Sequence, residues 1–317
     1  MGDEPLFRAG HHMHAPEEVR AIRRHLRWLW WPGGRVRHIA EQVLEDPGRP
    51  LLAEEMAALR ESLSRPAALN WHERVVAAWV LSRAGLTPEQ AQEAAATLAA
   101  VLVRQTRHAV GVACGLGCFL PWVAFPLAAF WALTDGRLNR VRAACALALG
   151  QLRLPETIGH VASALFDAPG LRRTGGSVRV RRAAEWALPL LSAALGPEHY
   201  GGLPAETVPL LCRAVLHEKR EVALAAVEAL RVAGDGRAVD PLRRVRKWQV
   251  HTSVWRAVQD ALPVLVERQA RERAAELLLR PAESLPGQTD LLLRPAAGGG
   301  PVDAELLLRP HQGTEEP

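Results

Sequence analysis

The chain has 317 residues, 49% of them hydrophobic, which is enough apolar material for a large core built as one elongated unit or as two domains. Its four cysteines follow no pairing pattern, which excludes a disulfide-stapled scaffold and predicts buried free thiols in a reducing compartment. A net charge of +5 and a pI near 9.5 permit an anionic partner.

The first predicted helix, Glu17–Trp31, carries several arginines and ends in tryptophans. Trp28, Trp30 and Trp31 are candidate membrane contacts, because an indole is half apolar and half hydrogen-bonding and guanidinium groups meet phosphates in the headgroup zone. The alternative is that these tryptophans cap a helical array and that the arginines form a solvated face. Further along, Leu69–Ala84 weakly resembles the repeat helices described below.

An apolar run follows at Ala109–Leu133 and contains no charged residue. As a helix its 25 residues would extend about 37 Å, against a bilayer hydrocarbon core of roughly 30 Å. A surface helix of a water-soluble protein keeps a polar face, and this run has none. We therefore expect it to enter a membrane, with Trp122 and Trp131 as further membrane contacts; the alternative is a fully buried helix pair.

Two details of the run favour a re-entrant hairpin over a single span. Pro121 and Pro126 interrupt its centre, and arginines flank both of its ends. Because basic flanks are typical of the cytoplasmic side, two basic ends suit a hairpin whose termini share one side. The sequence leaves the span, the hairpin and the buried pair open. The flanking arginines are Arg104, Arg107, Arg137, Arg140 and Arg142.

The second half of the chain contains a recurring repeat pattern, in which apolar residues stand at offsets 0, 3, 4, 7, 8 and 11 from a valine. These offsets place six side chains on one helix face, so each copy predicts an amphipathic helix that needs a covering partner. The copies begin 39, 42 and 32 residues apart, which is room for two helices but not for an independent domain. Their first residues are Val141, Val180, Val222 and Val254.

A second apolar segment follows each of the first three copies, entered at Pro155–Ile158, Pro204–Val208 and Asp235–Val239. The repeating unit is therefore predicted to be a helical hairpin. Many of its residues are alanine, which lets stacked helices approach closely. A coiled-coil bundle would need larger residues in a strict heptad, and the sequence has no such heptad.

These features resemble the bacterial HEAT repeat family, especially the HEAT-like type first described in phycobilisome lyases. The resemblance rests on Val141–Ala144, Val180–Ala184 and Gly234–Leu242, and it covers roughly Arg137–Leu279. It implies an all-α superhelix, or solenoid, that acts by binding other macromolecules. It concerns the repeat alone and transfers no lyase residues.

A basic cluster lies in the last of the second segments. In a HEAT-like solenoid the second helices build the concave face, so these cations are candidate partner-binding residues that could contact nucleic acid phosphates. Acidic residues interspersed elsewhere in the repeats, such as Glu185 and Glu228, weaken the nucleic-acid interpretation. The cluster consists of Arg243, Arg244, Arg246 and Lys247.

The tail repeats the peptide Leu-Leu-Leu-Arg-Pro three times, each copy preceded by an acidic residue. Spacers rich in Pro, Gly and Ala separate the copies, so we expect a disordered segment that offers a trivalent short motif. Its arginines, Arg280, Arg294 and Arg309, are candidate contacts to a carboxylate or phosphate of a partner. The alternative is a neutral expansion, or a first copy that simply ends the last helix.

The sequence contains no pattern that indicates catalysis or a cofactor. There is no nucleophile elbow, no phosphate-binding loop, and neither His72-Glu73 nor His217-Glu218 is followed by a histidine at the zinc spacing. His11–His14 could chelate a metal only adventitiously. We expect no enzyme activity, no resident metal or cofactor and no small-molecule substrate.

The sequence thus predicts a non-enzymatic HEAT-repeat scaffold for protein–protein interactions, associated with a membrane and with its repeats in the cytoplasm. The alternative is a soluble cytoplasmic nucleic-acid-binding solenoid. The N-terminus lacks the features of a secretory signal. The expected organisation is a disordered N-terminus (1–15), a helical region (16–108), the apolar segment (109–133), the repeats (137–279) and a disordered tail (280–317).

Overall fold

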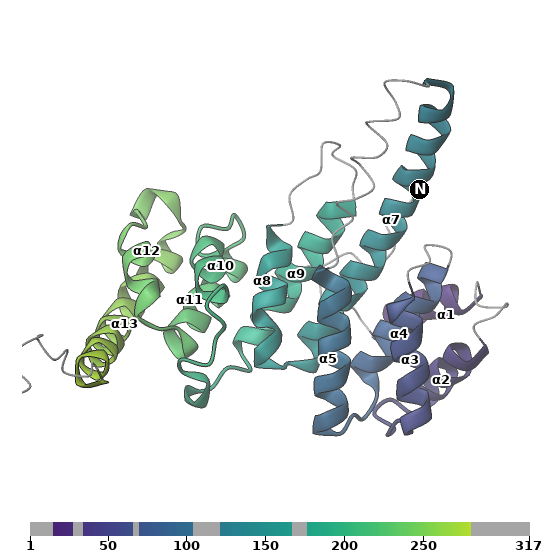
Figure 1. Cartoon of the computed structure of the whole chain (residues 1–317), viewed down its shortest axis with the longest axis horizontal. Coiled ribbons are helices and arrows are strands. Elements are labelled where there is room, and N and C mark those ends of the chain that lie inside the picture. Colours follow the sequence, from purple (N-terminus) through teal and green to yellow (C-terminus); the bar gives the residue numbers. More distant parts are fainter. Residues whose placement is uncertain (1–14, 28–33, 66–69, 104–120, 167–175, 280–317) are drawn as a thin grey trace, which may run out of the picture. The chain divides into compact units, whose positions relative to one another are not determined.

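The computed structural model describes residues 15–27, 34–65, 70–103, 121–166 and 176–279, with side chains at 19–27, 34–65, 70–103, 136–166 and 178–275. This part of the chain is all-α, as predicted: it holds twelve α-helices and no β-strand (Figure 1). The helices are α1 (Ala15–Arg27), α2 (Gly34–Glu45), α3 (Ala53–Ser64), α4 (Trp71–Arg83), α5 (Pro88–Val103), α7 (Pro121–Leu152), α8 (Ile158–Leu165), α9 (Gly176–Ser192), α10 (Thr207–Ala214), α11 (Arg220–Ala233), α12 (Val239–Arg243) and α13 (Thr252–Leu279).

Short 3-10 turns lead into or out of several of these helices: η3 (Pro155–Thr157), η4 (Pro197–His199), η5 (Gly236–Ala238) and η6 (Lys247–Gln249). The chain divides into two units, Met1–Ala270 and Arg271–Pro317. Of the second unit the structure describes residues 271–279, which are the helical end of α13. The leucines of the first tail motif therefore end a helix, in agreement with one of the alternatives drawn from the sequence.

Within the first unit the helices pack as successive hairpins in two layers. The first layer contains α2, α4, α7, α9 and α11, each in contact with the next. In the second layer α3 contacts α5, α5 contacts α8, α8 contacts α10, and α10 contacts the turn η5 that leads into α12. Figure 1 shows α8, α10 and α12 following one another beside α9, α11 and α13. The layering begins at α2, well before the point where the repeat pattern becomes readable in the sequence.

The four copies of the repeat pattern lie on α7, α9, α11 and α13, so the predicted helices are confirmed. In α9 and α11 all six positions of the pattern are buried. In α7 and α13 four of the six are buried, and Ala144, Leu152, Ala257 and Leu262 are half-buried. Helix α7 also buries residues outside the pattern, because it contacts α4, α5 and α9 together. It is therefore more deeply enclosed than an amphipathic helix would be.

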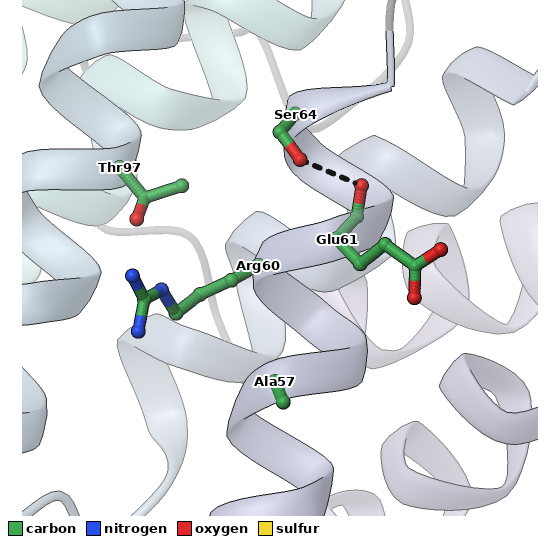
Figure 2. Close-up of a pocket in the computed structure, with 5 residues that line it drawn as sticks. All are labelled: Ala57, Arg60, Glu61, Ser64 and Thr97. Carbon is green, nitrogen blue, oxygen red and sulfur yellow. Dashed lines mark hydrogen bonds between the residues drawn. The ribbon is translucent and has the colours of Figure 1, made fainter.

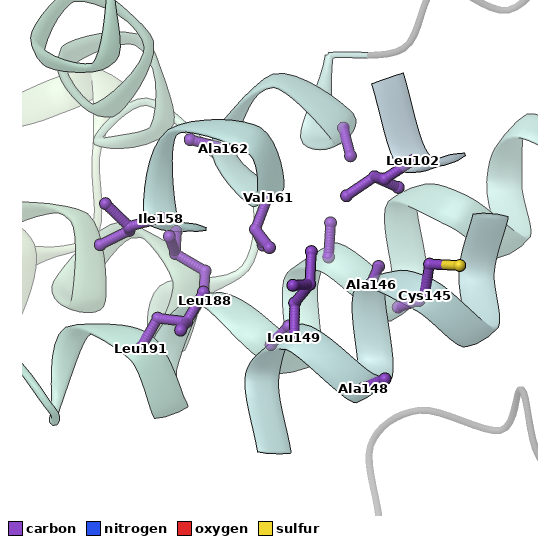
Figure 3. Close-up of a cluster of buried hydrophobic side chains, with 14 of the residues drawn as sticks. Leu102, Cys145, Ala146, Ala148, Leu149, Ile158, Val161, Ala162, Leu188 and Leu191 are labelled. Carbon is purple, nitrogen blue, oxygen red and sulfur yellow. The ribbon is translucent and has the colours of Figure 1, made fainter. Parts of the chain in front are cut away.

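The core is a continuous cluster of small aliphatic side chains. Figure 3 shows Leu102 of α5, Leu149 of α7, Val161 of α8 and Leu188 of α9, and all four are 1% exposed or less. Removing such side chains from water is the main force that holds hairpin to hairpin. Within the described residues the free cysteines, Cys145 and Cys212, are buried as predicted, and burial raises the pKa of each thiol to about 12.

Glycine permits the closest helix contacts in both layers. A Cβ added at Gly150 of α7 would lie 2.7 Å from the Cα and Cβ of Ala187 on α9. In the second layer, a Cβ at Gly159 of α8 would lie 2.4 Å from Oγ1 of Thr207 on α10. Both distances are far below van der Waals contact, so the spacing between these helices depends on residues without a side chain.

The apolar run Ala109–Leu133 is described only from Pro121 onward. Helix α7 begins at that proline and continues unbroken through Pro126 to Leu152, so one helix joins the end of the apolar run to the first repeat. A proline at a helix start is favourable because its missing N–H needs no partner there. Within the described residues no helix offers an apolar stretch long enough to cross a bilayer. The first part of the run lies outside the described residues.

Two of the arginines that flank this run have partners inside the protein. Arg142 is 6% exposed, and its guanidinium donates from Nε to the carbonyl oxygen of Leu102 at 2.8 Å. It thereby satisfies a carbonyl near the end of α5 that the helix itself leaves open. Arg140 places its guanidinium 4.7 Å from the ring centre of Trp71. At these two positions the flanking charge stabilises the fold.

Candidate binding surface

The cationic residues singled out in the sequence belong to an exposed stretch between α12 and α13, here called the basic segment (Arg243–Trp248). Leu242 and Val245 hold this stretch to the protein, with 1% and 5% exposed surface. The remaining residues of the segment are all exposed, since two apolar side chains three positions apart occupy the inward face. Sequence and structure thus agree that these cations are accessible.

The turn η6 fixes the end of the basic segment. The backbone N–H of Arg246 donates to Oε1 of Gln249 at 2.8 Å, and the N–H of Gln249 donates to the carbonyl oxygen of Arg246 at 2.9 Å. These reciprocal hydrogen bonds resemble a capping box, which fixes a turn by satisfying its free donors. Trp248 stands in the middle of this turn and is 83% exposed. A large indole is thus held out from the surface on a defined backbone.

The charge of the basic segment is not neutralised locally. Between Asp240 and Asp260 the chain has no acidic residue. Within the part of the chain that the structure describes, none of the four cations of the segment makes an ion pair. Several arginines elsewhere do, at 2.5–2.8 Å from a carboxylate oxygen. Sequence reasoning found the cations but missed Trp248; the signal that could have found it is a tryptophan next to the cations in an acid-free stretch.

A second group of charged residues, around Glu185, is buried, and its members pair with one another. Glu185 of α9 keeps 4% of its side-chain surface, and Nζ of Lys219 lies 2.6 Å from its Oε2. His217 accepts the backbone N–H of Lys219 at Nδ1, so its proton sits on Nε2, which lies 3.4 Å from Oε1 of Glu185. Burial alone would raise the pKa of Glu185, but the hydrogen bonds from His217 and Lys219 outweigh it and lower the pKa. We call these three residues the Glu185 cluster; it ties α9 to the connection between α10 and α11.

A buried histidine joins α1 to α4. Nδ1 of His25 lies 2.8 Å from Nδ1 of His72, and the His25 ring meets the edge of Trp71 at 5.3 Å between centroids. Burial, and after it the positive charges of Arg140 and Arg24, lower the pKa of His25 to about 4. In the described residues no three His, Cys, Asp or Glu side chains gather as a metal site would require. We interpret this group as a packing contact between helices.

A shallow hollow of about 330 Å³ lies between α3 and α5 (Figure 2). Its charged residues are already paired, since Arg60 reaches Glu93 at 2.6 Å and Arg65 reaches Glu61 at 2.6 Å. Ser64 donates its hydroxyl to the carbonyl oxygen of Glu61. With these groups occupied, the hollow has no arrangement suited to chemistry on a ligand. Its lining residues are Ala57, Arg60, Glu61, Ser64 and Thr97.

The side chains of the remaining residues proposed from the sequence lie outside the described part of the chain. Trp28, Trp30 and Trp31 and the tail arginines lie outside the described residues, as do Cys114 and Cys118. Trp122 and Trp131 belong to the backbone of α7, but their side chains are not among those described. The structure therefore brings together only one group of the predicted contacts, the four cations of the basic segment. The tail arginines are Arg280, Arg294 and Arg309.

The described part of the chain is an all-α protein of packed helical hairpins. No family model matches the chain, and no curated protein matches it. A solved structure of an engineered protein is similar to it: the match covers 84% of this chain and 99% of the engineered one, at 14% sequence identity and a TM-score of 0.36. This likeness is too distant to carry an argument about function.

Proposed function

We propose that this chain is a non-enzymatic HEAT-like solenoid that serves as a scaffold for protein–protein interactions. The observation that supports this most is the regular packing, in which each first-layer helix from α2 to α11 contacts the next and the second layer continues from α3 through α10 to the turn η5. Such an array grows in one direction and offers a surface longer than that of a globular domain with the same number of residues. The repeat pattern and its resemblance to HEAT sequences point the same way.

Recognition would use the exposed side chains of the second layer. In a HEAT-like array these helices line the concave face, so side chains from consecutive hairpins meet one extended partner. His160 of α8 and Arg213 of α10 are exposed and occupy this layer. Beyond the array, the tail would offer the two Leu-Leu-Leu-Arg-Pro motifs that follow α13 to a second partner, and tethering would raise their effective concentration to the millimolar range.

Charge reversal on one layer tests the scaffold. Affinity purification of the full chain should recover a defined set of proteins, and His160→Glu with Arg213→Glu should remove those bound by the second layer. The control, Arg182→Glu with Arg220→Glu, reverses two exposed positions on the first-layer helices α9 and α11 and should retain them. Identical recovery by both variants would contradict recognition through the second layer.

We also propose that Ala109–Leu133 holds the scaffold at a membrane. The run is free of charge and long enough to enter the hydrocarbon core, and its last residues, from Pro121, form the beginning of α7. Fractionation of cells that express the full chain or a variant lacking residues 109–133 tests this. The full chain should pellet with membranes and resist carbonate extraction, whereas the deletion should remain in the supernatant. Equal behaviour of the two proteins would return the run to the protein core.

A further inference from the structure

The basic segment combines two features that a water-exposed surface has little reason to keep together. Its four cations have no acidic neighbour in the sequence from 241 to 259. Beside them Trp248 exposes 83% of its surface on a turn held by two hydrogen bonds. Trp248 is the most exposed large apolar side chain among the described residues, and it follows directly after the cations. Exposed aromatic surface next to unneutralised charge therefore points to a place where a partner binds.

The distribution of charge narrows the kind of partner. Helices α5 and α8 of the second layer contain no lysine or arginine. Two other cations on helices of that layer already have contacts within the protein: Arg213 of α10 lies 4.2 Å from the ring centre of Phe166, and Arg60 of α3 pairs with Glu93. The described cations therefore form a local patch and not a track along the second layer. An extended nucleic acid backbone would need such a track, whereas a planar surface needs only the patch.

We propose that the basic segment docks onto anionic phospholipid headgroups. Arg243, Arg244, Arg246 and Lys247 would lie near lipid phosphates and carboxylates, and Trp248 would enter the interfacial zone, where an indole can bury its ring and keep its N–H hydrogen-bonded. The contact rests on the proposed location at a membrane, but it uses the repeat array and not the apolar run. It is electrostatic, so it weakens as ionic strength rises.

Vesicle sedimentation of the full chain tests this docking. The probes are vesicles of phosphatidylcholine alone and vesicles in which one third of the lipid is phosphatidylserine. Binding to the neutral vesicles reports the apolar run, and the added binding due to phosphatidylserine reports the basic segment. Because each basic residue near an anionic surface contributes about fivefold to binding, Arg243→Gln with Arg244→Gln should lower the added binding by at least tenfold, to roughly 1/25 of its value.

Two matched controls separate the segment from general effects. Arg182→Gln with Arg220→Gln removes the same charge from other exposed positions and should leave most of the added binding. Trp248→Ala should lower binding at low and at physiological ionic strength alike, whereas Leu216→Ala, at a side chain that is 48% exposed, should not. All five substituted arginine and tryptophan positions are exposed, so thermal unfolding of the variants should match that of the unmodified chain.

The outcomes are distinct. A phosphatidylserine-dependent increment that disappears only in the basic-segment variants supports the docking, even if the neutral vesicles bind nothing and the role of the apolar run fails. The proposal is overturned if that increment is absent, or if the control pair of arginines loses it equally. It is also overturned if single-stranded polyuridine binds more tightly than the vesicles and the same two arginines account for that binding, because the segment then recognises nucleic acid.

Discussion

Lys219 and Lys247, the two lysines of the chain, carry the same charge in opposite surroundings. Each precedes a helix that carries a copy of the repeat pattern, Lys219 at the start of α11 and Lys247 shortly before α13. Lys219 reaches the buried carboxylate of Glu185, whereas Lys247 is exposed in the basic segment and has no such partner among the described residues. The same residue type therefore stabilises the fold in one hairpin and is available to a partner in the next.

The cause of this difference lies in one position of the repeat. Glu185 stands five residues after Val180, the first residue of its copy of the pattern. The equivalent position in the following copy is Val227, which is 2% exposed and cannot accept a proton or a charge. A buried carboxylate recruits the cations around it, because an unpaired one would be very costly, and without a carboxylate the cations stay in water. The comparison predicts that changing a buried ionisable group alters the free energy of unfolding, whereas changing an exposed one alters binding to a partner.

The largest effect on stability is expected at His25, a buried ionisable group whose pKa is lowered by burial and by the charges of Arg140 and Arg24. Its pKa of about 4 lies below the unfolded value of 6.5, so as the pH falls the unfolded state takes up the proton first. The stability that the neutral ring provides is therefore complete above pH 6.5 and is lost progressively toward pH 4, by about 3 kcal/mol in all.

Urea unfolding between pH 7 and pH 4 measures this loss. His25→Phe keeps an aromatic ring beside Trp71 but cannot titrate, so the free energy of unfolding of this variant should fall less steeply over the same range. His38→Gln, at an exposed histidine, should follow the unmodified chain. If the free energy of unfolding depended on pH in the same way for the chain and for His25→Phe, His25 would have an ordinary pKa. The prediction that rests on its burial would then be wrong.

The next largest effect is expected at the Glu185 cluster. Lys219→Met leaves the buried carboxylate with His217 and the more distant Arg181, and it should lower the free energy of unfolding at pH 7 by about 2 kcal/mol. This is below the range for fully buried pairs, because 41% of the Lys219 side chain is exposed to solvent. Because the partners lower the pKa of Glu185, their contribution is present above the unfolded value of 4.5 and disappears as the pH falls through the folded value.

Chemical unfolding at two pH values tests this prediction. The unmodified chain and Lys219→Met should differ at pH 7 and become similar once Glu185 is protonated in both. A difference that stays constant down to low pH would mean that the methylenes of Lys219, and not its charge, stabilise the connection between α10 and α11. Arg181 lies 3.9 Å from Oε1 of Glu185 and is too distant to replace the lysine fully.

The repeat pattern made much of the fold predictable, because its spacing depends only on the helical period. It located α7, α9, α11 and α13 from small apolar residues, and the second helices from the segments that follow. Before the apolar run it indicated only α4, through the weak resemblance of Leu69–Ala84, and it missed α2, α3 and α5. Helix α4 buries Glu73 and Arg74 along with its apolar residues, so its pattern is weak. The place of these helices in the layers follows from contacts distant in sequence, which a local period does not reveal.

The roles of charged residues were predictable only where the local sequence decides them. Arg243, Arg244, Arg246 and Lys247 were identified as accessible because four cations in five positions cannot all face a core. Arg142 and Arg181 have the same place in successive copies, yet Arg142 is buried against α5 and Arg181 is half-buried near Glu185. Their roles depend on the neighbouring helix, so the sequence of one hairpin cannot assign them.

The smallest effect on stability is expected at the other lysine. Lys247→Met should change the free energy of unfolding by no more than about 0.5 kcal/mol, because the side chain is exposed and makes no ion pair among the described residues. Lys219→Met makes the same chemical change, so the two variants form a matched pair. A difference between their thermal unfolding then reports the different surroundings of the two lysines. A loss at Lys247 as large as that at Lys219 would mean that the basic segment contributes to the fold, and the contrast between the two lysines would fail.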